Sequence, residues 1–188
     1  MCIPSRYRQA GISLVELVMF IVIVGVAVAG VLSVMNVTTR HSADPMLRKQ
    51  ALAIAESLLE EIELQPFTYC DPDDANAASA TGAFVGVNGC AATVEALGPE
   101  TGETRYASPQ FDNVNDYSGF SMSPIVDITN SPLAGLGAYT ASVSITQAGA
   151  RFSLPAAEVL QIDVRVISGD TDITLTGYRF RYAPNAVP

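Results

Sequence analysis

The feature that most constrains this chain is one uninterrupted apolar stretch near its N-terminus. Residues 17–35 are 19 residues without a charged side chain. At a helical rise of about 1.5 Å per residue they span roughly 29 Å, the thickness of the hydrocarbon core of a bilayer. We therefore predict a membrane-spanning helix over residues 12–35. Glu16 lies at its N-terminal edge, where a carboxylate is costly unless it reaches the interface or finds a partner, so Glu16 is a candidate functional residue.

The residues ahead of this stretch do not form an ordinary secretory signal peptide. The first eleven residues contain Arg6 and Arg8, contain no acid, and end at Gly11. A secretory signal places its apolar core before the cleavage site, whereas here the apolar core follows the small residue. Basic residues lie on both sides of the span within the counting window, so charge counting does not orient it.

Residues 11–17, Gly-Ile-Ser-Leu-Val-Glu-Leu, resemble the class III signal of type IV prepilins and type II secretion pseudopilins. The resemblance implies that a prepilin peptidase cuts after Gly11 at the cytoplasmic face, and that Ile12 becomes the first residue, which is usually N-methylated. It also implies that Glu16 meets the N-terminal amine of a neighbouring subunit, a pairing that makes both charges tolerable in hydrocarbon. The alternative, from hydropathy alone, is an uncleaved single-span anchor.

Composition indicates one small domain beyond the span. The 188 residues are 49% apolar and 15% charged, with a formal charge of −9. Removal of Arg6 and Arg8 would leave 8 basic residues against 19 acidic ones, a charge of −11. This balance argues against a nucleic-acid surface. A local basic patch from Arg165, Arg179 and Arg181 is the alternative, although arginines on strands more often flank a solvated sheet face.

The cysteines predict one disulfide. Cys2 lies in the leader, which leaves Cys70 and Cys90 as a pair that can oxidise if the domain is periplasmic. Closing a loop with 19 intervening residues stabilises the fold by about 3 kcal/mol in the chain-entropy description. Two buried free thiols are the alternative. The only histidine, His41, lies in the stalk, so these cysteines do not predict a metal site.

Residues 36–66 are predicted to form an amphipathic stalk helix that Pro66 terminates. Asp44 and Pro45 mark either its start or a bend in one long helix. Apolar residues recur at three- and four-residue steps and predict one buried stripe. The stripe consists of Leu47, Ala51, Ile54, Ala55, Leu58 and Ile62.

The opposite face of this helix is acidic, with Glu56, Glu60 and Glu63. Glu56 and Glu60 are like charges four residues apart, which destabilises an isolated helix. One hypothesis is that cations of a neighbouring subunit compensate this repulsion. A plain solvated face is the alternative.

Residues 67–110 carry little periodicity and many small residues, so we predict a long loop with one short strand near residues 93–97. Asp71, Asp73 and Asp74 suggest a calcium loop. No metal site is predicted, however, because the Gly and the final Glu of the EF-hand pattern are missing.

Residues 111–120 form a turn-rich segment with carboxylate and amide oxygens, and we predict a surface loop held by its aromatic side chains. The chain contains no phosphate-binding glycine motif and no nucleophile elbow, and its single histidine leaves hydrolytic triads and zinc catalysis without their parts. Neither a catalytic residue nor a cofactor is predicted.

Three strands are predicted over residues 139–146, 159–167 and 172–182, because apolar and polar side chains alternate there. The residues expected on the buried face are Tyr139, Ala141, Val143 and Ile145 in the first strand and Leu160, Ile162, Val164 and Val166 in the second. Residues 168–170 are predicted to be the turn of a hairpin.

In the last strand the apolar set shifts across Gly177, from Ile173 and Leu175 to Tyr178, Phe180 and Tyr182, which predicts a bulge. Arg179 and Arg181 would then be outward charges that discourage pairing with another sheet. The tail, residues 183–188, is predicted to be mobile.

The predicted fold class is α+β, a long N-terminal helix whose second half packs on a C-terminal antiparallel sheet in residues 67–188, which is the layout of the pilin fold. Residues 51–62, 111–120 and 175–182 resemble the D-type minor pilin of the mannose-sensitive haemagglutinin (MSHA) pilus. Residues 51–62 also resemble the I-type pseudopilin and the V-type minor pilin.

The resemblance implies a non-enzymatic minor pilin, anchored in the bacterial inner membrane with its C-terminal domain in the periplasm and later incorporated into a filament or its tip. The implied partners are prepilin peptidase, other major and minor pilins, the inner-membrane assembly platform and, before assembly, membrane lipid; no nucleic acid is expected. The alternatives are a minor pseudopilin of a type II secretion system and a binding or adhesin module carried at a filament tip.

Overall fold

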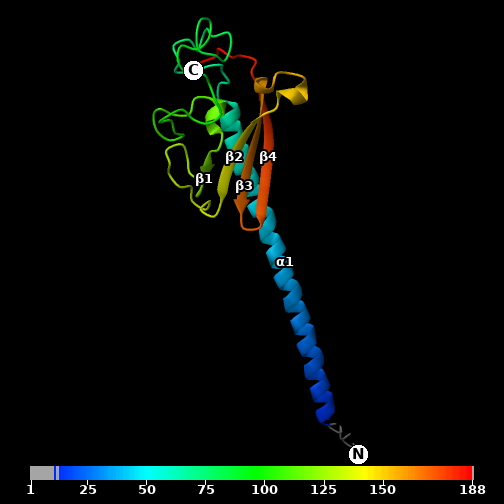
Figure 1. Ribbon diagram of the computed structural model, residues 1–188. Coiled ribbons are helices and arrows are strands. Elements are labelled where there is room, and N and C mark those ends of the chain that lie inside the picture. The colour runs from blue at the N-terminus through cyan, green and yellow to red at the C-terminus, as the bar shows by residue number, and fades with distance from the viewer. Residues whose placement is uncertain (1–10, 12, 188) are drawn as a thin grey trace, which may run out of the picture. The chain divides into compact units, whose positions relative to one another are not determined.

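The computed structural model of the protein describes residue 11 and residues 13–187, and within residues 37–44 only the helical backbone. The chain divides into two compact units, residues up to Pro45 and residues from Met46 onward. Helix α1, Leu14–Glu63, begins in the first unit and ends in the second (Figure 1). Pro45 lies inside α1, so the helix does not start at this proline.

The second unit contains a four-stranded antiparallel sheet in the order β1-β2-β3-β4. Its strands are β1 (Ser121–Met122), β2 (Thr140–Gln147), β3 (Val159–Ser168) and β4 (Thr171–Phe180). Three short 3-10 helices accompany them: η1 (Val114–Tyr117), η2 (Gly149–Phe152) and η3 (Ala156–Glu158). The predictions of an α+β fold, of three strands and of a hairpin turn between β3 and β4 are confirmed, whereas β1 was not predicted.

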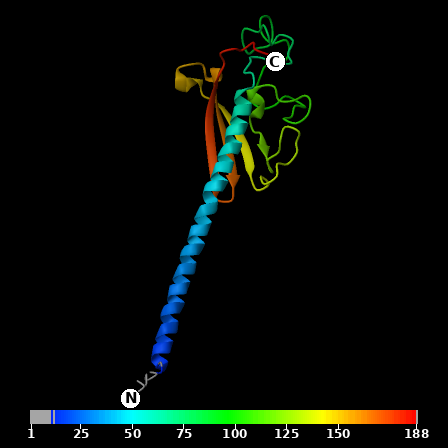
Figure 2. The same cartoon turned by 180° about the vertical axis from the view of Figure 1, so that it is seen from behind.

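The core of this unit lies between the sheet and the part of α1 that follows Pro45. This part of α1 passes behind the sheet in Figure 1 and in front of it in Figure 2. The predicted inward residues of β2 and β3 are all buried, and so is the helix stripe except for Leu47, which is exposed. Each fully buried branched side chain contributes about 1.5–3 kcal/mol to folding. The alternating apolar side chains of the strands and the apolar stripe of the helix therefore pack together in one core.

Strand β4 contains no bulge. It pairs with β3 in one continuous register, in which Gly177 lies opposite Ile162. A side chain at Gly177 would collide with Glu63 and Leu59 of α1. The shift in the apolar pattern has another cause: Tyr178 and Phe180 are on the outer face of the sheet, where both pack against Phe152.

The predicted outward positions of Arg179 and Arg181 are also wrong. Arg179 donates a hydrogen bond to the carbonyl of Gln65 at 2.9 Å. The side chain of Arg181 is 6% exposed and pairs with Glu158 at 3.3 Å. Arg165 is exposed, as predicted for β3, and pairs with Asp172. All three arginines of the sequence's possible basic patch thus contact groups within the fold.

The connection between α1 and β1 contains no strand in the described chain, so the strand predicted near residues 93–97 is wrong. Within residues 93–97 the described pairing is a single isolated bridge, between Val94 and Cys70. The segment 111–120 is held by edge-to-face contacts among Phe111, Tyr117 and Phe120, as predicted. It is not a surface loop, however, because the four residues of η1 are buried.

The C-terminal tail is anchored up to Val187, which packs against the small core around the disulfide. The carbonyl of Pro184 accepts a hydrogen bond from the N–H of Tyr69, and the side-chain amide of Asn185 donates to the carbonyls of Ala77 and Ala80 at 2.9 Å. The predicted mobility of residues 183–187 is therefore not observed.

Candidate functional site

The first candidate site is the surface of α1 in the first unit. Leu14–Asn36 is long and apolar enough to cross a membrane, and none of it is buried within the protein. Its large apolar side chains are 40% to 76% exposed. An apolar surface of this extent needs lipid or other apolar helices to cover it. Leu14–Asn36 is therefore a candidate membrane span.

Two of the predicted processing and assembly residues lie at the start of this helix. Gly11 comes just before α1, is exposed, and has no atom within 4 Å of the position that a Cβ would occupy. Glu16 lies in the first turn and is also exposed. A carboxylate in the first turn interacts favourably with the positive end of the helix dipole. Ile12 lies outside the described residues.

A disulfide joins Cys70 and Cys90, whose Cα atoms are 5.5 Å apart. Both cysteines are buried in a small separate core with Ala77 and Ala80. Asp74 holds the same loop together, because its carboxylate accepts the backbone N–H groups of residues 91–93 at 2.7–2.8 Å. This part of the loop is therefore fixed by local polar bonds and one covalent link.

The second candidate site is a group of carboxylates that the loops bring together, here called the acidic cluster. Its members are Asp71, Asp73, Glu95, Glu100, Glu103, Asp112 and Asp116. They form three overlapping triads, within each of which one oxygen per residue lies within 4.8 Å of the others. The triads are Asp71–Asp73–Asp112, Asp71–Glu100–Glu103 and Glu95–Glu100–Asp116.

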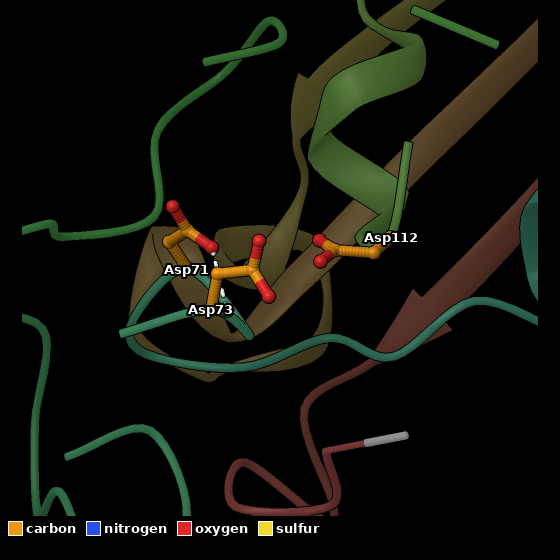
Figure 3. A group of neighbouring side chains, drawn as sticks. All are labelled: Asp71, Asp73 and Asp112. Atoms are coloured by element: carbon orange, nitrogen blue, oxygen red, sulfur yellow. Dashed lines mark hydrogen bonds between the residues drawn. The ribbon is translucent and has the colours of Figure 1, made fainter. Parts of the chain in front are cut away.

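The outermost triad joins two segments that are far apart in the sequence. Figure 3 shows Asp71 and Asp73 on one loop and Asp112 on another, with the carboxylates of Asp73 and Asp112 facing each other. Asp71 is buried and accepts the backbone N–H of Asp73 at 2.8 Å. Asp73 is exposed, so this triad opens to solvent.

The innermost triad is buried. Glu95 is 8% exposed, and neither of its carboxylate oxygens has a hydrogen-bond partner among the described residues. Asp116 is fully buried; its Oδ2 accepts the N–H groups of Asp112 and Asn113, whereas its Oδ1 has no partner in the described chain. Burying a charge without such partners is costly. These three oxygens are therefore unusual for the interior of a protein.

Burial and mutual repulsion hold these carboxyls in their neutral form at higher pH than usual. Desolvation, with repulsion from Asp116 and Glu100, raises the pKa of Glu95 to about 10. Desolvation and nearby carboxylates likewise raise the pKa of Glu100, Glu103 and Asp112 to about 7 and that of Asp116 to about 6.

Asp74 is the counter-example in the same loops. Desolvation acts to raise its pKa, but the backbone N–H groups of Thr93, Ala91 and Ala92 stabilise the charged form and bring the pKa below its usual range. Asp74 therefore needs no cation, whereas both oxygens of Glu95 and Oδ1 of Asp116 have no such donors among the described residues.

The nearby arginines do not neutralise the acidic cluster. Arg105 makes a two-pronged ion pair with Glu61 of α1, with Nε and Nη2 at 2.6 and 2.7 Å from its oxygens. Arg181 lines a cavity of about 180 Å³ together with Glu95 but pairs with Glu158. In the part of the chain that the structure describes, no ion pair links an arginine or lysine to a member of the cluster.

The sequence indicates some of these residues but not the cluster. Asp71 and Asp73 stand beside Asp74, whose carboxylate bonds elsewhere in the structure, and residues 111–120 lie far from them in the chain. Glu95, Glu100 and Glu103 were not singled out, although they recur within nine residues of a loop otherwise rich in small residues. What joins them to Asp116 is the packing of η1, for which the sequence carries no periodic signal.

Comparison with known proteins finds no matching family model, no similar curated protein and no similar solved structure. Function is therefore inferred from the residues and their geometry.

Proposed function

We propose that this protein is a minor subunit of a type IV pilus of the MSHA kind, cleaved by prepilin peptidase and assembled into the filament or its initiating complex. The observation that carries the proposal is the exposed apolar surface of Leu14–Asn36, which begins three residues after Gly11 and carries one carboxylate, Glu16, in its first turn. A helix of this kind can rest in lipid before assembly and against other such helices afterwards.

The second unit supports the same proposal. It contains an antiparallel sheet packed on the continuation of α1 and a disulfide-closed loop, which suits an oxidising compartment outside the cytoplasm. In this orientation the N-terminus would face the cytoplasm, where the peptidase acts. The helix would then be extracted from the bilayer, and burial among neighbouring helices would replace contact with lipid.

Glu16 has a specific part in this proposal. In the assembled filament it would meet the N-terminal amine of a neighbouring subunit, and this pairing would set the register between the two helices. The same amine exists only after cleavage at Gly11. Processing and assembly are therefore linked through one charge pair.

The first test is the intact mass and N-terminal sequence of the protein purified from membranes of a host that contains prepilin peptidase. We expect a chain that starts at Ile12, with or without one methyl group. A chain that retains Met1, in cells that process another prepilin, would instead identify an ordinary membrane anchor with an extracytoplasmic domain.

The second test separates processing from assembly. We expect Glu16→Val to be cleaved normally but to be lost from sheared filaments, whereas the matched control Ser33→Val, also polar-to-apolar within the span, assembles like the wild type. Equal recovery of both variants in filaments would contradict the role of Glu16. A type II pseudopilin is distinguished by gene deletion, which would block protein export instead of surface piliation.

A further inference from the structure

We propose that the inner triad of the acidic cluster, Glu95, Glu100 and Asp116, binds a Ca²⁺ ion. This inference goes beyond the proposed function and does not depend on it. It starts from an observation about burial: Glu95 is more than nine-tenths buried, yet neither of its carboxylate oxygens meets a donor in the described chain. Asp116 repeats this arrangement with its Oδ1.

The geometry fits one ion of this size. Ca²⁺ binds oxygens at about 2.3–2.6 Å, so two oxygens on one ion lie at most about 5 Å apart. One oxygen from each of Glu95, Glu100 and Asp116 falls within 4.8 Å of the other two. An unpartnered oxygen of Glu95 is therefore close enough to share a ligand with one carboxylate oxygen of Asp116 and one of Glu100.

Further oxygens lie close to this triad. Glu100 is also a member of the triad with Asp71 and Glu103, and Oε2 of Glu103 is buried without a partner in the described residues. The side-chain oxygen of Asn115 is likewise buried and unpartnered, and Asn115 lines the cavity that Glu95 lines. Ca²⁺ accepts six to eight carboxylate, carbonyl or water oxygens in flexible geometry, whereas Mg²⁺ demands a near-ideal octahedron. Loops with several acids therefore favour Ca²⁺.

The competing explanation is that protons, not a metal ion, neutralise the triad. The charged groups acting on Glu95 are Asp116 and Glu100, then Asp71 and Asp112, all of which raise its pKa. From the C-terminal segment, Arg181 interacts with Glu95 at longer range, while its closest partner is Glu158. Ca²⁺ binds carboxylates in their ionised form, so a cluster that is neutralised only by protons would show neither heat nor stabilisation with CaCl₂. Loss of binding when Glu95 is neutralised distinguishes this site from exposed surface acids.

The experiment uses the full chain in detergent, stripped with a chelator and titrated with CaCl₂ by calorimetry. We expect a dissociation constant of about 1 mM or below, in the range of extracellular calcium sites, with weaker binding of Mg²⁺. We expect a rise in melting temperature of about 5 °C at saturation.

Two variants test whether the inner triad binds the ion. Glu95→Gln should weaken Ca²⁺ binding about tenfold or more, because the ion loses one charged ligand. The matched control Glu56→Gln removes an exposed carboxylate of α1 and should change binding less than about twofold. Glu95→Gln should melt no lower than the wild type in chelator, which shows that the variant folds. If it does not fold, Glu100→Gln, at a half-buried position of the same triad, takes its place.

Two results would overturn the proposal. The first is the absence of both heat and thermal stabilisation at about 10 mM CaCl₂ near pH 8, well above the affinity range of extracellular sites. The second is equal binding by Glu95→Gln and Glu56→Gln, which would assign the ion to other acids. Each can occur whether or not the protein is a pilin, so failure here leaves the proposed function intact.

Discussion

In the sheet region of the second unit, burial removes apolar side chains from water, whereas in the loops of residues 67–120 it also removes carboxylates. Ile162 and Val164 are completely buried and lie among other apolar groups. Glu95 is almost as deeply buried but has like charges for neighbours. The sheet therefore gains free energy from burial itself, while the loops gain it only when something neutralises their charge. Stability in one molecule thus has two sources, of which only one should respond to pH and ions.

The largest effect should come from the sheet. Ile162→Ala removes a fully buried side chain at the centre of β3 and should lower the free energy of unfolding by about 4 kcal/mol, through lost transfer energy and a cavity. The measurement is urea unfolding of the full chain in detergent. The control Ile128→Ala, at a side chain 50% exposed, should cost about 1 kcal/mol or less. Similar losses for the two variants would show that apolar burial in the sheet is not the main source of stability.

A second change tests the contact between β4 and α1. Gly177→Val places a side chain where the ends of the Glu63 and Leu59 side chains lie, so both must move aside, and it should cost about 2 kcal/mol in the same urea assay. Gly137→Val is the matched control, because no described atom lies within 4 Å of the added Cβ there. If Gly177→Val were tolerated as well as Gly137→Val, the packing of Glu63 and Leu59 over Gly177 would not contribute to stability.

The third prediction concerns pH and the loops. In chelator-stripped protein the pKa values of Glu100, Glu103 and Asp112 are raised to about 7, from about 4 in the unfolded chain. Between these values the folded state holds more protons, so the free energy of unfolding should fall as pH rises from about 5 to about 8.

Because these groups are only partly buried and therefore screened, we expect a loss of about 2 kcal/mol over that range, measured by urea unfolding. Saturating Ca²⁺ should flatten the decline, since it binds the ionised carboxylates that the folded protein otherwise keeps protonated. If the free energy of unfolding instead rose between these pH values in chelator, the folded state would not hold the extra protons, and this prediction would be refuted.

The smallest effect on stability should come from Asp74, whose charge is already stabilised by backbone N–H groups. Asp74→Ala removes the acceptor for the backbone N–H groups of residues 91–93 and should cost about 1 kcal/mol in stability. Asp170→Ala, in the exposed turn before β4, serves as the control and should lie within about 0.5 kcal/mol of the wild type. Ca²⁺ should not alter the stability change caused by either substitution, because neither residue belongs to the acidic cluster. A calcium-dependent effect at Asp74 would mean that the ion contacts the disulfide loop.

The sequence predicted the sheet region well because alternation has a direct physical meaning. Successive side chains of a strand point to opposite faces, so alternating apolar residues identify the buried face. Val143, Ile145, Ile162 and Val164 are buried as this pattern predicts. The pattern failed in β4, where Tyr178 and Phe180 pack on the outer face against Phe152. Aromatic residues can find partners outside the main core, and a period-2 pattern does not say which face is which.

The loops were predictable only in part. The Cys70–Cys90 pair followed from counting, but the ion pair between Arg105 and Glu61 joins residues 44 positions apart and leaves no local signal. The acidic cluster likewise depends on the packing of η1 against the segment that contains Glu95. Contacts of this kind come from tertiary structure alone, and a linear pattern cannot represent them.

The anchored tail has a consequence for how the protein is made. Tyr69 bonds to Pro184, and Ala77 and Ala80 bond to Asn185. A ribosome delivers the earlier partners more than a hundred residues before the later ones, and an export channel passes them in the same order. The disulfide loop therefore emerges long before it can close its last contacts, which form only when the C-terminal tail arrives.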